Sequence, residues 1–192
     1  MRIVGGSLRG LKLVDLGEGD SGAHLRPTTD RVREAIFNLL VNGTHGNPVP
    51  GARVLDLFAG TGALGLEALS RGAAQATFVD DGATAQALIR SNIAKARVQA
   101  ETDVLRRDAT RLGDNRGAPY DLVFLDPPYA GGLGERAIVQ AIGGGWLAPG
   151  AMVVWEEGRP PLVPAPLKQI DQRRYGDTVV TLARLPDGGP GG

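Results

Sequence analysis

The amino-acid sequence predicts an α/β domain in which a parallel sheet carries helices on both faces. From Arg53 onward, short apolar runs alternate with segments of helical periodicity, a pattern typical of strand–helix repeats. The run at 122–125 is apolar throughout, as expected for a strand buried on both faces. Ligands of such folds bind at the carboxyl ends of the strands, so the residues that follow each strand are the candidates for chemistry.

The residues before Arg53 predict a hairpin, a loop and one helix. Apolar residues at 3–4 and 11–14 flank a glycine pair, which indicates two short strands joined by a tight turn, and the polar stretch 15–25 indicates a loop. Thr28, Thr29 and Asp30 are all competent helix caps. Apolar residues recur from Val32 at offsets of 3, 4, 7 and 8, so a helix is expected up to Asn42.

The alternating region supplies the remaining elements in order. Glycine closes the first of its helices, and the last residues, 186–192, are rich in glycine and proline and are expected to be a disordered tail. We expect helices at 64–71, 83–96 and 136–142, and strands at 54–57, 76–79, 104–105, 122–125, 152–155, 168–172 and 178–183.

Composition excludes several classes of function. The 192 residues include no cysteine, so disulfides, thiolate metal sites and cysteine nucleophiles are ruled out. His24 and His45 lack metal-ligand spacing, and neither a membrane span nor a signal peptide is evident, so a cytoplasmic protein is expected. The net charge is zero, which argues against non-specific coating of nucleic acid but leaves room for a local basic patch.

A glycine-rich turn follows the first strand of the alternating region. Gly60, Gly62 and Gly65 satisfy the G-x-G-x-x-G pattern, which allows a ligand to approach the backbone closely. Asp56 ends the strand before them, and a carboxylate there is a poor neighbour for a pyrophosphate but a good one for an ammonium group. The pattern therefore favours S-adenosylmethionine over a dinucleotide.

Two further acidic residues follow the second and third strands. Asp80 comes about 20 residues after the glycine turn, where a carboxylate can accept the hydroxyls of an adenosine ribose. Asp81 follows directly, so the sequence leaves open which of the two holds the ribose and which caps the next helix. Asp108 can either accept from the adenine amino group or cap the segment that follows it.

The most informative motif is Asp126-Pro127-Pro128-Tyr129, directly after the buried strand at 122–125. Two prolines stiffen the backbone and leave carbonyl acceptors without N–H donors. A base amino group is a poor nucleophile because its lone pair is delocalised, and acceptors at Asp126 and the Pro127 carbonyl would free that lone pair. Tyr129 can stack on the base, and Asp126 can take the released proton. A base in a helix or in folded RNA would have to flip out to reach the motif.

Other classes of protein share parts of this pattern. A nicotinamide-dependent oxidoreductase would use the same glycines, but Asp56 and the lack of an evident hydride-transfer acid argue against it. A non-catalytic RNA-binding module would not need both the glycine turn and the D-P-P-Y motif. Adenine-N6 methylation of DNA and glutamine-N5 methylation of protein follow the same chemistry and stay open, whereas a cytosine-C5 enzyme is excluded because it needs a cysteine.

The residues also carry a resemblance to a known family. The run 54–65 resembles the first S-adenosylmethionine motif of Rossmann-like methyltransferases, and 126–129 resembles their amino-methylation motif. The blocks 2–6, 9–13, 26–34 and 175–178 resemble the bacterial 16S ribosomal RNA guanine-N2 methyltransferase family known as RsmD. The likeness covers roughly residues 1–184. One departure is Asp80-Asp81-Gly82, where the family more often has a single glutamate.

The resemblance implies a complete set of expectations. The fold would be a Rossmann-like methyltransferase sheet of seven strands with one reversed strand, formed by residues 26–185, and residues 1–25 would be a hairpin extension that contacts RNA. The substrate would be a guanine N2 amino group in 16S ribosomal RNA of an assembled or assembling small subunit. The protein would act as a monomer and would bind no metal ion. The guanine would be held by Asp126, Pro127 and Tyr129; S-adenosylmethionine by Asp56, Phe58, Gly60, Thr61, Gly62, Asp80, Asp108 and Ala109; and RNA by Arg9, Lys12, Arg26, Thr28, Arg31 and Arg33.

Overall fold

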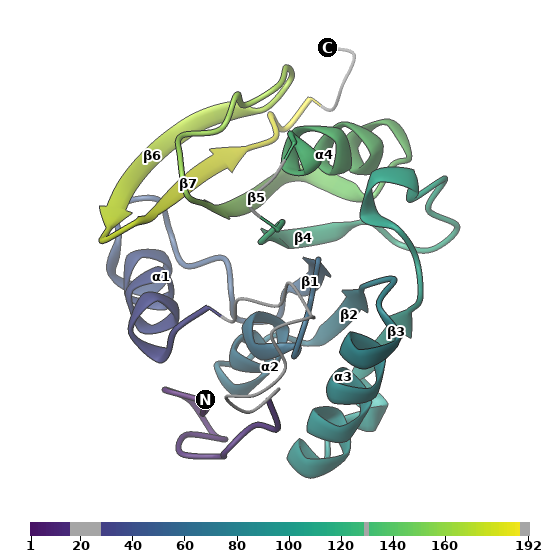
Figure 1. The fold of residues 1–192 in the computed structure, drawn as a ribbon. Coiled ribbons are helices and arrows are strands. Elements are labelled where there is room, and N and C mark those ends of the chain that lie inside the picture. Colours follow the sequence, from purple (N-terminus) through teal and green to yellow (C-terminus); the bar gives the residue numbers. More distant parts are fainter. Residues whose placement is uncertain (16–27, 129–130, 189–192) are drawn as a thin grey trace.

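A computed structural model describes residues 1–15, 28–128 and 131–188, and these residues form one seven-stranded sheet with helices on both faces (Figure 1). The strand order is β3-β2-β1-β4-β5-β7-β6. Strands β1 to β5 run parallel, and β7 runs antiparallel to both β5 and β6. The expected mostly parallel sheet with one reversed strand is therefore confirmed.

Every strand and helix expected from Arg53 onward is present, most of them longer than the sequence pattern indicates. Both ends of α4 and the start of β5 lie beyond the expected bounds, because glycine and proline in these stretches weaken the sequence signal. The strands are β1 (Arg53–Leu57), β2 (Gln75–Val79), β3 (Thr102–Leu105), β4 (Tyr120–Leu125), β5 (Leu147–Glu157), β6 (Lys168–Tyr175) and β7 (Thr178–Arg184); the helices are α1 (Asp30–Asn42), α2 (Ala63–Ser70), α3 (Ala83–Ala96) and α4 (Leu133–Gly143).

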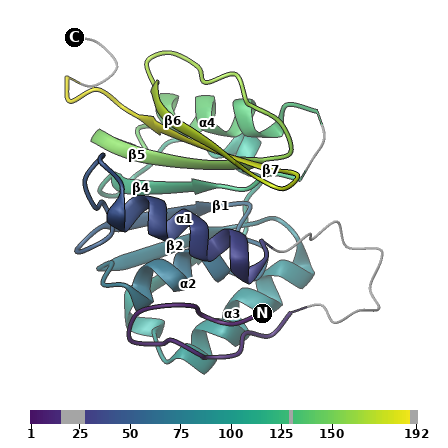
Figure 2. The ribbon, with the colours of Figure 1, turned by 90° about the vertical axis from the view of Figure 1, so that its left-hand side faces the viewer.

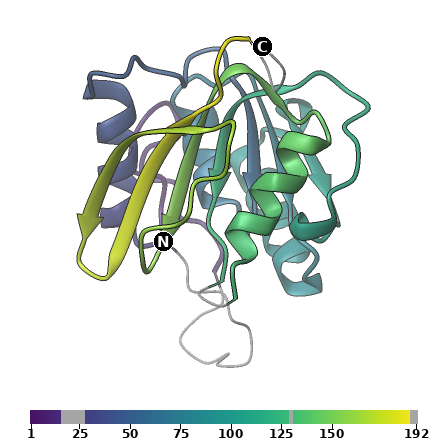
Figure 3. The same cartoon turned by 90° about the horizontal axis from the view of Figure 1, so that it is seen from above.

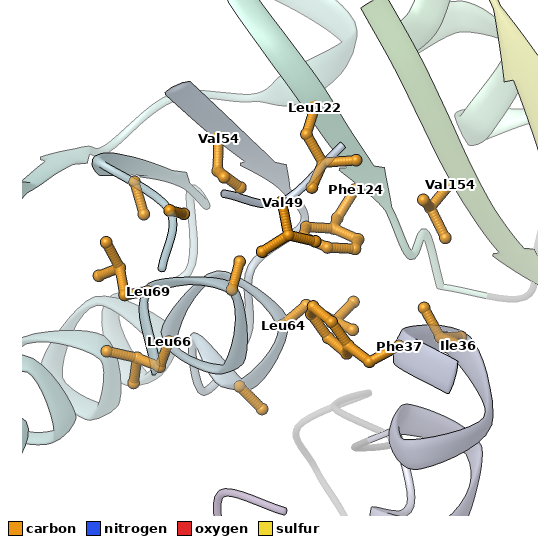
Figure 4. Packing of buried hydrophobic residues seen from close by; sticks show 14 of the residues in the cluster. Ile36, Phe37, Val49, Val54, Leu64, Leu66, Leu69, Leu122, Phe124 and Val154 are labelled. Carbon is orange, nitrogen blue, oxygen red and sulfur yellow. The ribbon is translucent and has the colours of Figure 1, made fainter. Parts of the chain in front are cut away.

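Period-two alternation along the strands divides the core into two layers. Even-numbered residues such as Val54, Phe124 and Val154 pack against α1 and α2, on the side that Figure 4 shows close up. Odd-numbered residues such as Leu55 and Trp155 pack on the other face, against α4. Figure 1 shows α1, α2 and α3 below the sheet and α4 above it, and Figure 3 turns the α4 face toward the viewer.

Helix α4 packs directly on a side chain of β5. Gly134, in its first turn, is buried, and a Cβ atom added there would lie 2.6 Å from the Trp155 ring. Only a residue without a side chain therefore lets this helix approach the sheet so closely.

The N-terminal segment, residues 1–15, folds back on itself but forms a single β-bridge, between Arg2 and Lys12, instead of two strands. It lies beside α2 and α3 (Figure 2). The Glu67 carboxylate accepts hydrogen bonds from the Val4 and Gly5 N–H groups at 2.9 and 2.8 Å. Asn92 of α3 bonds both the N–H and the carbonyl of Val14. The segment expected to form a hairpin therefore packs on α2 and α3 of the same domain.

Candidate active site

The register of the sheet aligns the ends of the parallel strands. Leu57 lies opposite Val79 and Leu125, and Leu125 lies opposite Trp155. The residues that come next along the chain therefore form one row at the carboxyl edge of the sheet, where α/β proteins bind their ligands. The row contains Phe58, Asp80, Asp126 and Glu156.

The Asp56 side chain stabilises the turn that follows β1. Gly62 precedes α2 in a left-handed conformation (φ 79°) and offers the helix no side-chain cap. The Asp56 carboxyl supplies that partner, because it accepts a hydrogen bond from the Gly65 N–H at 2.9 Å. Gly65 has to be glycine, since a Cβ atom there would overlap the Phe78 ring. The G-x-G-x-x-G spacing is thus needed for packing as well as for a ligand.

Burial changes the ionisation of Asp56. The side chain is 1% exposed, and burial raises its pKa to about 8, helped by the nearby Asp80 and opposed by the hydrogen bond from Gly65. Asp56 does not line the cavity described below. Direct contact between Asp56 and a cofactor stays a prediction, and in this structure the residue supports the turn.

Asp80 is the better placed of the two neighbouring aspartates. Its carboxylate accepts from the Gly60 N–H at 3.0 Å and from the Gly82 N–H at 2.9 Å, so it ties the glycine turn to the end of β2. Burial raises the pKa of Asp80, while these two hydrogen bonds oppose the shift. Asp81 is exposed on the same loop. The fixed orientation favours Asp80 as the residue that would accept ribose hydroxyls.

A cavity of about 410 Å³ opens beside this row, within the size range of small-molecule sites. Its wall combines carboxylates, guanidinium groups and apolar side chains, which suits a ligand that has a hydroxyl-bearing sugar, an aromatic base and a charged end. The lining residues are Phe58, Val79, Asp80, Asp81, Arg107, Asp108, Ala109, Thr110, Arg111, Pro128, Leu133 and Arg136.

Four of the eight predicted cofactor residues line this cavity, namely Phe58, Asp80, Asp108 and Ala109. Asp108 caps a short 3-10 turn by accepting from the Thr110 N–H at 2.8 Å, and the Thr110 hydroxyl bond is the main cause that lowers its pKa. The sequence pattern missed Leu133 and Arg136, because a helix signal does not show which of its faces a cavity meets. Gly60, Thr61 and Gly62 are buried in the turn itself.

Asp126 has two partners that the sequence did not reveal. The Thr28 hydroxyl oxygen lies 2.9 Å from Asp126 Oδ2 and 3.0 Å from Glu156 Oε2. Alternation along the strands places Asp126 and Glu156 on the face that α1 covers, and Thr28 lies just before this helix. A carboxylate directly after a buried parallel strand was the available signal, and it applies to Glu156 at the end of β5 as well as to Asp126.

Burial raises the pKa of both carboxyl groups. Burial raises the pKa of Asp126 well above its usual range, and the adjacent Glu156 and Asp56 add to the shift. Burial likewise raises the pKa of Glu156 to about 7, against the effects of the Thr28 hydrogen bond and the Arg33 charge. Because one hydroxyl group bridges them, the two carboxyl groups are placed to titrate jointly.

Arg33 and Thr28 correct the expected RNA surface. Arg33 is fully buried, where it pairs with Asp30 at 2.7 Å and with Glu67 at 3.4 Å and donates to the Thr28 carbonyl at 3.3 Å. Thr28 is 7% exposed and contacts Asp126 instead. Neither side chain is available to RNA, because charge and hydroxyl patterns in a sequence do not reveal buried partners.

The remaining predicted RNA residues divide into two groups. Arg9, Lys12 and Arg31 are exposed on the surface that the N-terminal segment and α1 form. Arg26 lies outside the described residues. So do His24, most of the loop 15–25, the end of the tail and Tyr129, which the sequence predicts to stack on the base. Within the described ranges, no group of histidine and acidic side chains could hold a metal ion, and no helix is long and apolar enough to cross a membrane.

Solved structures share this architecture. The protein yhhF from Escherichia coli matches with a TM-score of 0.81 at 37% identity, covering 97% of this chain and 98% of that chain. The protein HI0767 from Haemophilus influenzae matches with a TM-score of 0.76 at 29% identity, covering 97% and 98%. Together with the site at the strand ends, these similarities define a Rossmann-like methyltransferase fold.

The family model described as Conserved hypothetical protein 95 matches residues 1–184, and the chain belongs to this family, the RsmD family. Ribosomal RNA small subunit methyltransferase D of Escherichia coli (strain K12) is 43% identical over 169 residues, which are 86% of this chain and 80% of that protein. The protein of the same name from Haemophilus influenzae is 38% identical over 160 residues, 81% of this chain and 78% of that protein.

Proposed function

We propose that this protein transfers a methyl group from S-adenosylmethionine to the N2 amino group of a guanine in 16S ribosomal RNA, within the small ribosomal subunit or an assembly intermediate. The observation that carries the proposal is the Asp126-Pro127-Pro128 run directly after the buried strand β4: Pro128 lines the cavity, and Asp126, which does not line it, lies two residues earlier along the chain. The names of the relatives, ribosomal RNA small subunit methyltransferases, support the substrate class.

The proposed chemistry is positioning of a weak nucleophile. The Asp126 carboxylate and the Pro127 carbonyl would accept hydrogen bonds from the two N–H groups of the substrate amine, which keeps its lone pair free to react. Holding two reactants in line can contribute about 7–11 kcal/mol to lowering a barrier. S-adenosylmethionine, when bound, supplies an electrophilic methyl group on a sulfonium. Tyr129 would stack on the base.

The cavity wall offers matching groups for the methyl donor. Asp80 is oriented by Gly60 and Gly82 and would accept the ribose hydroxyls, while Asp108 and Ala109 would border the adenine. Phe58 would provide an apolar contact. The cavity holds three arginines but also three aspartates, so it is not built for a polyanionic ligand such as a dinucleotide.

RNA would approach over the exposed basic residues Arg9, Lys12 and Arg31. The net charge of zero means that these few cations cannot give strong general affinity for nucleic acid. Protein surfaces of the subunit near the guanine would then supply the rest of the binding energy.

A product assay tests the proposal. The protein is incubated with labelled S-adenosylmethionine and undermodified small subunits, naked 16S RNA or duplex DNA, and the methylated nucleoside is identified by mass spectrometry. We expect N2-methylguanosine from the ribosomal substrates. N6-methyladenine from the DNA would instead establish the adenine-N6 alternative.

Asp126→Ala is the matched variant. It should abolish methyl transfer and leave S-adenosylmethionine binding, measured by calorimetry, within a few-fold, because Asp126 would hold the base and not the methyl donor. General base and positioning contributions of this kind are worth about 10²–10⁴-fold in rate. Loss of cofactor binding in this variant, or methyl transfer retained at the wild-type rate, would show that the roles are assigned wrongly.

A further inference from the structure

The Thr28 hydroxyl lies between two carboxyl groups, 2.9 Å from Asp126 Oδ2 and 3.0 Å from Glu156 Oε2. A hydroxyl group has one hydrogen to donate, so it can serve only one ionised carboxylate. The other carboxyl group must then donate to the hydroxyl oxygen, and to do so it must carry a proton. The geometry is therefore that of a short relay in which one proton is shared.

We propose that Glu156 and Thr28 are positioning residues for Asp126: protonated Glu156 donates to Thr28, Thr28 donates to Asp126, and Asp126 stays the ionised acceptor that faces the substrate amine. The inference rests on the proposed role of Asp126 in amine methylation. It assigns a purpose to Glu156, a carboxyl group that is 4% exposed and has no cation bonded to it among the described residues.

The substrate amine would set the direction of the relay. Burial raises the pKa of both carboxyl groups and so does not separate them, but only Asp126 would receive the N–H groups of the amine, which favour its charged form. Arg33 is the cation near Glu156, but its guanidinium is already bonded to Asp30 and Glu67. Asp56 on β1 repels a charge on Asp126, and on β7 the residue opposite Glu156 is the apolar Val180.

The relay is fixed in space by its surroundings. Arg33 donates to the Thr28 carbonyl, and the Thr29 side chain accepts from the Val32 N–H to start α1. The hydroxyl that joins the two carboxyl groups is therefore attached to the rigid beginning of a helix. Since the oxygens of Asp126 are held on one side by Thr28, the remaining lone pairs point at defined positions for a substrate.

The proton balance of methyl transfer fits this arrangement. The substrate nitrogen forms a bond to the methyl carbon while the carbon–sulfur bond breaks and its electron pair stays on sulfur. The methylated nitrogen is then cationic and gives one proton to the Asp126 carboxylate. Asp126 and Glu156 now hold two protons, and the half-buried Asp126 releases one to water to restore the starting state.

Four variants separate this relay from a merely structural role. Glu156→Gln keeps a donor toward Thr28 but cannot ionise, and Glu156→Ala removes the donor. Thr28→Ser keeps the hydroxyl, and Thr28→Val removes it at nearly constant volume. The readouts are the pH profile of single-turnover methyl transfer, KM for RNA, and a carboxyl ¹³C NMR titration of the free protein, which needs no substrate.

We expect wild-type turnover to fall in acid, where Asp126 is protonated, and in alkali, where Glu156 ionises and Thr28 can no longer serve both groups. Glu156→Gln should keep the acid decline, lose the alkaline decline and stay within a few-fold of wild type at neutral pH. Thr28→Val should lower the rate about 10- to 100-fold with KM little changed, as for the removal of a hydrogen bond to a charged group, and Thr28→Ser should restore it.

Two results would overturn the inference. One is a Glu156→Gln enzyme with the alkaline decline intact, and the other is an Asp126 resonance that titrates identically in wild type and Glu156→Gln. The NMR titration also separates this inference from the proposed function. Coupled titration together with a product other than N2-methylguanosine would refute the proposed substrate alone.

Discussion

Asp56 shows how a single buried carboxyl group can make the stability of the fold depend on pH. Its oxygen replaces the missing cap of α2 by accepting from Gly65, yet burial raises its pKa from 3.8 to about 8. The folded protein therefore retains a proton that the unfolded chain releases above about pH 4. The stabilising effect of this group is full in acid and is lost as the pH rises toward 8.

Asp56→Asn tests this linkage. Asparagine keeps an oxygen acceptor for the Gly65 N–H but does not ionise, so the free energy of unfolding should fall less between pH 5 and pH 8 than in wild type. One such group changes that free energy by at most about 1.4 kcal/mol per pH unit. Urea unfolding at several pH values measures the slopes, and parallel curves for the two proteins would refute the assignment.

At the scale of elements, the N-terminal segment and α2 form one packed unit. Ser70 at the end of α2 accepts through its carbonyl from the Ser7 N–H at 2.7 Å and donates through its hydroxyl to the Gly5 carbonyl at 2.6 Å. Gly6 has φ 77°, and a Cβ atom there would overlap the Ser70 carbonyl. The glycine pair is therefore a docking requirement between two elements.

A matched pair of substitutions isolates that docking. Gly6 and Gly10 both have left-handed backbones, with φ 77° and 87°, but a Cβ atom at Gly10 meets nothing within 4 Å. Alanine should cost about 1–2 kcal/mol at either position from backbone strain. At Gly6 the steric overlap should add about 1–3 kcal/mol. Urea unfolding gives the comparison, and equal losses at the two positions would contradict the close approach to α2.

At the scale of the whole molecule, the net charge is zero, but exposed cationic side chains are found at particular places on the surface. The exposed cations Arg9 and Arg31 lie on the N-terminal segment and α1, whereas Arg116 is exposed in the loop that leads into the amino end of β4. If RNA binds over the first surface, affinity there should depend on salt through the release of counterions.

Arg9→Glu and Arg31→Glu should therefore weaken binding to the ribosomal substrate. Each should also lower the slope of log affinity against log salt by about 1 for every RNA phosphate that the arginine neutralises in the wild type. Arg116→Glu makes the same change of charge in the loop before β4 and should leave the slope unchanged. Filter binding over a series of salt concentrations provides the measurement. Equal effects of all three substitutions would remove Arg9 and Arg31 from a specific RNA surface.

The sheet was predictable because its strands carry strong local signals, whereas the side-chain partners in the site were not. Asp126 stands out between a buried apolar run and two prolines. Glu156 also follows a buried run, but its position beside Asp126 becomes visible only through the pairing of Leu125 with Trp155, which is a property of the sheet. Arg33 resembled a surface cation, because its partner Glu67 is 34 positions away along the chain.

The close packing of Gly134 on the Trp155 ring limits how the cavity can be redesigned. Leu133 and Arg136, on either side of this glycine, belong to the cavity wall. Any side chain at position 134 would displace α4 from the sheet and would move both wall residues with it. An effort to accept bulkier methyl-donor analogues should therefore shorten Leu133 or Arg136 and leave position 134 as it is.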